Sequence, residues 1–251
     1  MTKPRELTLI VYAPALVGKD GRPLDVVHGM EKALPGLRLK WRLSESGRPI
    51  ALPRRDAWLV ENIKDGGFPI VCNGDESYPV AVSGCEESAL FSPGGQPQFE
   101  VHAGLPLDEP VLAAAAALLE AVAEGAHAFW GHASPYGYGS EVSQQFRRSA
   151  QGPERSPRGL PMLNLPEKLP APETPCFLGW LNYWSAATAK TIGFPDPARD
   201  AELLTRARRT PSGGWVVQLT DAPLQYDTPA HLDALKRAYE RFPVIGGRSA
   251  P

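Results

Sequence analysis

The chain has 251 residues, of which 43% are hydrophobic and 22% charged, a composition typical of globular proteins. Its formal net charge of −2 provides no basic field, which argues against nucleic-acid binding. No segment approaches the about 18 consecutive apolar residues of a membrane helix. The three cysteines form no C-x-x-C pair, as expected of reduced thiols, so we predict a soluble cytoplasmic protein.

The first part of the chain alternates predicted strands and helices. Residues 7–13 are β-branched and aromatic, like a buried strand, and Asp25 can cap the helix that follows. Residues 35–44 alternate apolar with basic side chains, which predicts a strand with one buried face. A short helix is expected at residues 56–63, before a pair of glycines.

A β-hairpin and a long helix are the clearest local predictions. The runs FPIVC and YPVAVSG are joined through Asn73-Gly74, a pair typical of hairpin turns, and a strand near residues 99–105 comes next. Asp108, Glu109 and Pro110 then suit the start of a helix that extends to residue 126. The apolar stripe of this helix consists of Val111, Ala115, Leu118, Leu119 and Val122.

A proline-rich connection at residues 151–175 separates an N-terminal portion, 1–150, from a C-terminal portion, 176–251. The C-terminal pattern predicts a strand at 177–185, helices at 185–193 and 196–208, a strand at 213–220 and a closing helix capped by Thr228. We expect both portions to share one core. The predicted fold is a single α+β domain, with a mixed or antiparallel sheet covered by several helices.

The stretch GWLNYWS is apolar on both faces of its predicted strand. Trp180, Asn182 and Trp184 share one face, and Leu181 and Tyr183 share the other. Such a strand is central in a sheet, so these tryptophans are expected in the core rather than at a ligand.

Recognisable catalytic and metal-binding motifs are missing. His127 and His132 are five residues apart, which fits no standard zinc spacing, and there is no G-x-S-x-G elbow, P-loop or strand-linked G-x-G-x-x-G. We therefore predict no catalytic residue, no metal and no cofactor. The alternative is an uncharacterised hydrolase-like enzyme whose site lies near His102 and His132, since catalytic groups converge in space rather than along the chain.

Aromatic residues give the stronger signal for binding. The segment AFWGHASPYGYG places Trp130, His132, Tyr136 and Tyr138 in a glycine-rich stretch that we expect to be an exposed loop, although Trp130 can instead complete the core. Protein interfaces favour such side chains, and acids around them accelerate association with a basic partner. The acidic part of the predicted partner-binding set is Asp75, Glu76, Glu86 and Glu87, at the ends of the hairpin.

The segments LTLIVYAPALV, LPRRDAWL, AFWGHASP and LTDAPLQYDTPAHLDALKRAYERFPVIGG carry a family resemblance. Over residues 8–247 the chain resembles a myxobacterial family described as a domain of unknown function, DUF5953. This resemblance names a family and implies no activity.

A second resemblance rests on a few short motifs in the C-terminal half of the chain. The pattern is similar to immunity protein family 52 of polymorphic toxin systems, although Thr228 stands where that family has Asn and the proline-rich insertion is long. The resemblance implies a protein that neutralises a cognate toxin, often a nuclease, by stoichiometric binding. A housekeeping interaction module is the other non-enzymatic alternative, and the oligomeric state stays open. The positions that carry this pattern are Trp130-Gly131, Gly179-Trp180, Tyr183, Thr220-Asp221, and Asp227, Pro229 and His231.

Overall fold

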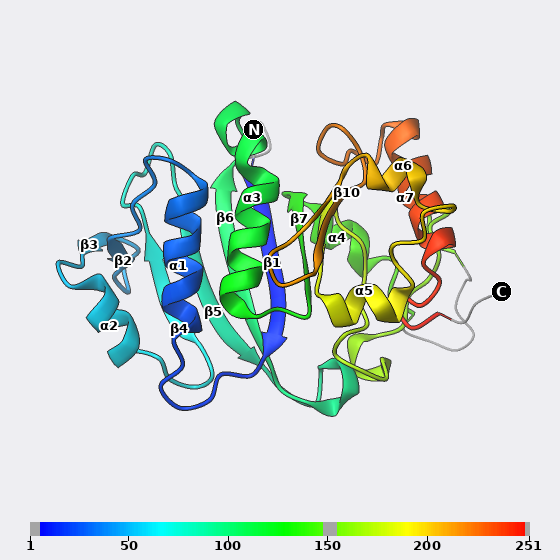
Figure 1. Cartoon of the computed structure of the whole chain (residues 1–251). Coiled ribbons are helices and arrows are strands. Elements are labelled where there is room, and N and C mark those ends of the chain that lie inside the picture. Colours follow the sequence, from blue (N-terminus) through cyan, green and yellow to red (C-terminus); the bar gives the residue numbers. More distant parts are fainter. Residues whose placement is uncertain (1–5, 148–154, 249–251) are drawn as a thin grey trace.

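The structure, a computed structural model, describes residues 6–147 and 155–248. Within them, ten strands form one antiparallel sheet in the order β3-β2-β4-β5-β6-β1-β7-β8-β10-β9 (Figure 1). This confirms the predicted α+β class. The strands are β1 (Glu6–Pro14), β2 (Trp41–Leu43), β3 (Pro49–Ala51), β4 (Phe68–Cys72), β5 (Ala81–Glu87), β6 (Gln98–Pro106), β7 (Trp130–Pro135), β8 (Leu181–Trp184), β9 (Ala207–Arg209) and β10 (Trp215–Gln218).

Seven α-helices and two short 3-10 helices accompany the sheet in the described residues. None of these helices is both long enough and apolar enough to cross a membrane. The helices are α1 (Arg22–Ala33), α2 (Arg55–Glu61), α3 (Glu109–Ala126), α4 (Tyr138–Ser143), α5 (Ala186–Ile192), α6 (Ala201–Leu204) and α7 (Pro229–Arg241), with η1 (Pro93–Gly95) and η2 (Pro166–Lys168).

Helices α1 and α3 lie side by side against the first face of the sheet (Figure 1). All five residues of the predicted α3 stripe are buried there, and the Asp108 side chain caps α3 by accepting the Val111 N–H at 3.0 Å. The two helices approach closely because glycines face the contact. A Cβ at Gly125 would lie 2.8 Å from the backbone carbon of Asp25, and one at Gly29 would lie 3.0 Å from the Ala121 oxygen.

The second face of the sheet is covered only over its C-terminal half. There the connection before β8, together with α5 and α7, packs onto β7, β8 and β10 around Trp130, Trp184, Tyr239 and Phe242. Strand β8 is therefore buried on both faces, as predicted. Trp180 is also buried, but it belongs to the core cluster of the first face rather than to that of Trp184. It precedes β8, and its indole N–H donates to the Thr220 oxygen at 2.8 Å.

The proline-rich connection is part of the core. Residues 151–154 lie outside the described residues, and from residue 155 onward the connection buries Leu160, Leu163 and Leu169. Backbone hydrogen bonds join it to neighbouring segments; for example, the Leu163 N–H donates to the Gln145 oxygen at 2.7 Å. This segment supplies the cover of the second face.

Several predicted boundaries were wrong. Helix α1 begins at Arg22, so Asp25 lies in its first turn and Gly21 occupies the cap position. The strand expected at 35–44 is reduced to Trp41–Leu43, although Leu37 and Leu39 are buried. The helix expected at 196–208 is only α6, because residues 207–209 pair with β10 at the edge of the sheet. Thr228 precedes α7 as expected, without a side-chain cap bond.

The buried positions predict large losses of stability on truncation. Leu118→Ala and Trp180→Ala should each lower the free energy of unfolding by about 3–5 kcal/mol, because each leaves a cavity in a close-packed core. Leu90→Ala, at a side chain that is 72% exposed, is the matched control and should change it by less than about 0.5 kcal/mol. Urea denaturation measures all three. Unchanged stability of Trp180→Ala would contradict its place in the core.

Candidate functional site

The uncovered half of the second sheet face is the candidate functional site, called here the open face. On β1, Leu7, Leu9, Val11 and Ala13 are buried beneath the helices, and the alternate residues point to the other side. Strand pairing extends this alternation to β6 and β5. The open face comprises Ser83, Cys85 and Glu87 of β5, Glu100 and His102 of β6, and Thr8, Ile10 and Tyr12 of β1. Gln98 of β6 points to the same side but is buried at the covered edge.

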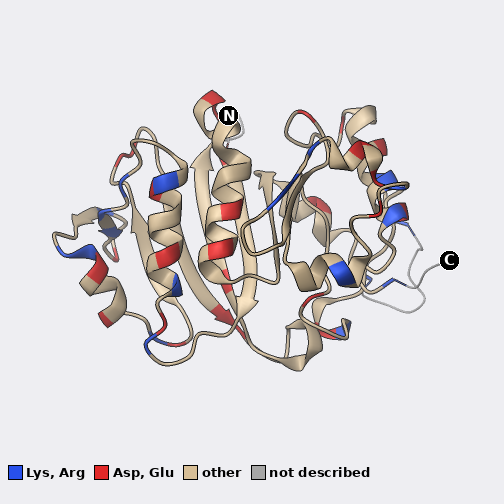
Figure 2. Cartoon of the chain, in the orientation of Figure 1, with Lys and Arg blue, Asp and Glu red and all other residues tan. Residues whose placement is uncertain are grey.

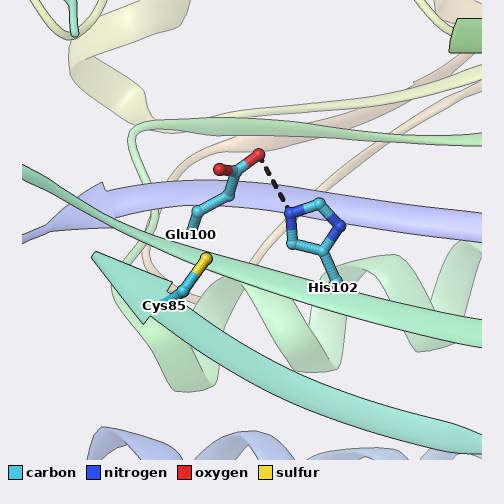
Figure 3. Close-up of side chains that lie close together, drawn as sticks. All are labelled: Cys85, Glu100 and His102. Atoms are coloured by element: carbon cyan, nitrogen blue, oxygen red, sulfur yellow. Dashed lines mark ion pairs between the residues drawn. The ribbon is translucent and has the colours of Figure 1, made fainter. Parts of the chain in front are cut away.

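Three side chains with reactive or metal-binding atoms meet on the open face (Figure 3). Cys85 of β5 stands directly opposite Glu100 of β6, and His102 follows two residues later on the same face. The His102 Nε2 lies 3.1 Å from the Glu100 Oε1. One ligand-type atom from each of the three residues lies within 4.8 Å of the other two. We call this group the Cys–Glu–His cluster.

A pocket of about 280 Å³ opens where the cover of the second face begins. Glu100 lines this pocket, so the Cys–Glu–His cluster borders it directly. Gln98, which is 2% exposed, also lines it, and the Gln98 Nε2 has no hydrogen-bond partner among the described residues. The other lining residues are Tyr12, Glu87, Phe91, Ser92, Pro93, Pro166, Glu167, Cys176 and Phe177.

The carboxylates give this part of the open face a negative potential. Burial and the neighbouring Glu100 raise the pKa of Glu87. Burial, Glu100 and Glu87 raise the pKa of the Cys85 thiol. Nucleophilic cysteines need the opposite shift, because the thiolate is the reactive form. The charges therefore favour a cation or a basic partner group over a catalytic thiolate.

Two apolar side chains project beside this pocket, from the loop between β5 and β6. Leu90 is 72% exposed and Phe91 57% exposed. The loop is held in place through η1, because the Gly94 N–H donates to the Leu169 oxygen of the connection at 2.9 Å. Together with Glu87 at the end of β5, which lines the pocket, this loop places exposed apolar side chains next to a carboxylate.

The predicted aromatic partner-binding residues are mostly inside the protein. Tyr136 is 57% exposed, as expected, but Tyr138 is only 5% exposed, because it begins α4 and stacks on Tyr226. Trp130 and His132 are buried in β7, not placed in a loop. The expectation of an exposed loop was therefore wrong for these three residues, while partner binding by Tyr136 stays a prediction.

The predicted acidic residues lie at two opposite ends of the sheet. Asp75 and Glu76 lie in the turn before β5, whereas Glu86 and Glu87 end that strand, which is seven residues long. Asp75 is further tied into its turn by accepting the Ser77 N–H at 2.9 Å. These four acids cannot surround one anchor, and Figure 2 likewise shows both signs of charge distributed over the whole fold.

The two histidines of the enzyme hypothesis do not form one site. His102 and His132 lie on either side of Ile10, since β1 separates β6 from β7, which places them about 10 Å apart. His132 is buried, and its Nδ1 contacts the Ser134 Oγ at 3.2 Å. The cluster that does form, with Cys85 and Glu100, was not predicted. Its one sequence signal is the spacing of Glu100 and His102, which puts both on one strand face.

Comparisons with known proteins show a family and a fold. The family model described as "Domain of unknown function (DUF5953)" matches residues 18–250. No curated protein matches the chain. Among solved structures, the Pseudomonas aeruginosa T6SS protein PA0821 is similar, with a TM-score of 0.50, 14% sequence identity, and coverage of 98% of this chain and 77% of that chain. At this identity the likeness concerns the fold alone. The resemblance to immunity protein family 52 and the myxobacterial origin stay predictions.

Burial of His132 predicts a loss of stability in acid. Desolvation, with a smaller effect of His102, lowers the pKa of His132 from 6.5 to about 3. Between pH 6.5 and about 3, the imidazole of His132 is therefore protonated in the unfolded chain but neutral in the folded protein. This contribution to stability is present above pH 6.5 and falls as the pH decreases towards 3. Between about pH 7 and pH 5 the protein should lose about 2 kcal/mol more than the His132→Leu variant. Urea denaturation at both pH values measures this difference, and equal losses would contradict a neutral buried imidazole.

Proposed function

The chain belongs to the DUF5953 family, and we propose that it is an immunity protein that binds a cognate toxin and neutralises it by stoichiometric contact. The family description states no activity. The observation that carries the proposal is the fold likeness, over 98% of this chain, to a protein named as a T6SS protein. A T6SS association is compatible with a toxin or with its immunity protein, and the motif resemblance to immunity protein family 52 favours the second.

The motif residues behind that resemblance support the fold. The Trp180 indole donates to the backbone of Thr220, and the Tyr183 hydroxyl donates to Glu124 at 2.9 Å. Trp130 stacks on Tyr12 with ring centroids 4.1 Å apart. The toxin-binding surface must therefore be sought elsewhere, among side chains that are free to contact a partner.

The loop of Leu90 and Phe91, with the adjoining pocket, is the proposed toxin-binding surface. Its exposed apolar side chains serve as anchors, and Glu87 and Glu100, which line the pocket, supply negative charge beside them. A nuclease toxin carries basic side chains for its nucleic acid substrate. An arginine of such a toxin can pair with Glu87 in the pocket while its guanidinium lies over Phe91. Binding of this kind covers the basic surface that the toxin needs.

A hydrolase is the second candidate, because the Cys–Glu–His cluster contains a nucleophile, a base and a carboxylate to orient the base. Two observations count against it. The pKa of the Cys85 thiol is raised, by burial and then by Glu100 and Glu87. His132, the second histidine expected in such a site, lies beyond β1. Protection of cells by the Cys85→Ala variant, at the level of the parent, would exclude a cysteine mechanism.

The first test is protection and complex formation with the toxin encoded beside this chain's gene. Co-expression should restore growth of cells that produce the toxin, and titration calorimetry should give one toxin per chain.

Replacing both Leu90 and Phe91 by alanine should weaken binding by about 2–4 kcal/mol, mainly through faster dissociation, since anchors dominate affinity. Tyr136→Ala is the matched control at the other end of the sheet. Weakening by Tyr136→Ala alone would move the interface there, and a parent protein that neither binds nor protects would refute the immunity role.

The second test concerns charge. The Glu86→Lys and Glu87→Lys double variant should slow association with a basic toxin and reduce the salt dependence of the rate, because steering by opposite charges is lost. The Asp75→Lys and Glu76→Lys double variant makes the same charge change beyond the other end of β5 and should affect the rate less. Stopped-flow association at several salt concentrations measures both. An equal or larger effect of the second pair would contradict the proposed surface.

A further inference from the structure

The Cys–Glu–His cluster has the composition of a metal site. A thiolate, an imidazole and a carboxylate are the three kinds of protein ligand that zinc takes, and catalytic or exchangeable zinc sites use three protein ligands with one open position. Cys85 is the exposed cysteine of the three in the chain, and Cys72 and Cys176 are buried. The cluster is thus the place where this protein offers a thiol next to other zinc ligands on an accessible surface.

We propose that Cys85, Glu100 and His102 bind one zinc ion on the open face, with the fourth coordination position left for water or another oxygen or nitrogen donor. This inference does not depend on the immunity role. Two paired strands supply the ligands, so the backbone positions them before any metal arrives. Cys85 and Glu100 are directly opposite in the register, and Glu100 and His102 are alternate residues of one strand.

The distances are compatible with closure around an ion. Zinc–ligand bonds of about 2.0–2.3 Å place neighbouring ligand atoms of a tetrahedral site about 3.3–3.7 Å apart. Here the His102 Nε2 and Glu100 Oε1 are 3.1 Å apart, and no separation in the cluster exceeds 4.8 Å. Side-chain rotations that move the ligand atoms by about 1 Å would bring all three to bonding distance of one zinc ion, without movement of the strands. The thiol releases its proton to solvent on binding, as metal-bound thiols do.

A second observation points to a ligand at the open position. Glu100 is shared between the cluster and the pocket, so a group bound to the metal can extend into that pocket. Gln98 lies two residues before Glu100 on the same face, and its buried Nε2 lacks an acceptor among the described residues. An unpaired buried donor is costly, and an oxygen atom in the pocket would satisfy it. The site therefore combines metal ligands with a donor for an oxygen-containing fourth ligand.

Cobalt(II) titration of the full chain tests the proposal, because Co²⁺ replaces Zn²⁺ and reports its ligands by absorption. One equivalent should produce the intense visible bands of a tetrahedral site and a near-ultraviolet thiolate charge-transfer band, and Zn²⁺ should abolish both. Cys85→Ser should remove the charge-transfer band. Each of Cys85→Ser, Glu100→Gln and His102→Ala should weaken binding at least about tenfold, since even indirect ligand contacts are worth that much.

The matched control is His28→Ala. His28 and Asp56 form an exposed histidine–carboxylate pair at 3.0 Å, like that of His102 and Glu100 but without a cysteine, and its loss should leave Co²⁺ binding unchanged. Thermal unfolding confirms that each variant is folded. The proposal is overturned if the parent shows no saturable thiolate band, if Cys85→Ser keeps that band, or if His28→Ala weakens binding as much as His102→Ala. The toxin assays do not enter this result, so the two proposals fail separately.

Discussion

The antiparallel pairing of β1 with β6 on one side and with β7 on the other is the interaction on which the rest of the structure depends. Strand β1 joins the hairpin half of the sheet to the C-terminal half through an unbroken register on both edges. Because side chains alternate along a strand, this register decides which residues share a face. It places Tyr12 between Glu100 and Trp130, and Ile10 between His102 and His132. A slip by one residue would bury the polar row and expose the core.

The helices and loops cover the two faces of the sheet unequally, and this leaves the open face and its pocket accessible. The first face is sealed by α1 and α3, while the second is covered only where the connection, α5 and α7 pack on it. The same alternation that gives β7 and β8 a second core leaves β5 and β6 with polar residues in contact with solvent. The pocket forms at the step between the covered and open halves, where Phe177 and Phe91 meet Glu100 and Gln98.

The carboxylates of Glu87 and Glu100 determine which groups can bind at this site. Burial, followed by Glu100 and Glu87, raises the pKa of the Cys85 thiol, which disfavours the reactive thiolate. The same potential attracts cations, whether a metal ion at the three ligands or a basic side chain of a protein beside them. The two uses involve neighbouring parts of one surface, with Glu100 at their boundary.

The sequence by itself determined the local elements and the class of the fold. Asn73-Gly74, the Asp108 cap and the two-sided apolar pattern of β8 are short-range signals, and each carries its physical cause within a few residues. Only the tertiary structure decided that Tyr138 is buried, that residues 207–209 form an edge strand, and that Cys85 stands beside Glu100 and His102. Burial and strand pairing depend on partners distant in the chain, and no local pattern specifies which face of a sheet will be left uncovered.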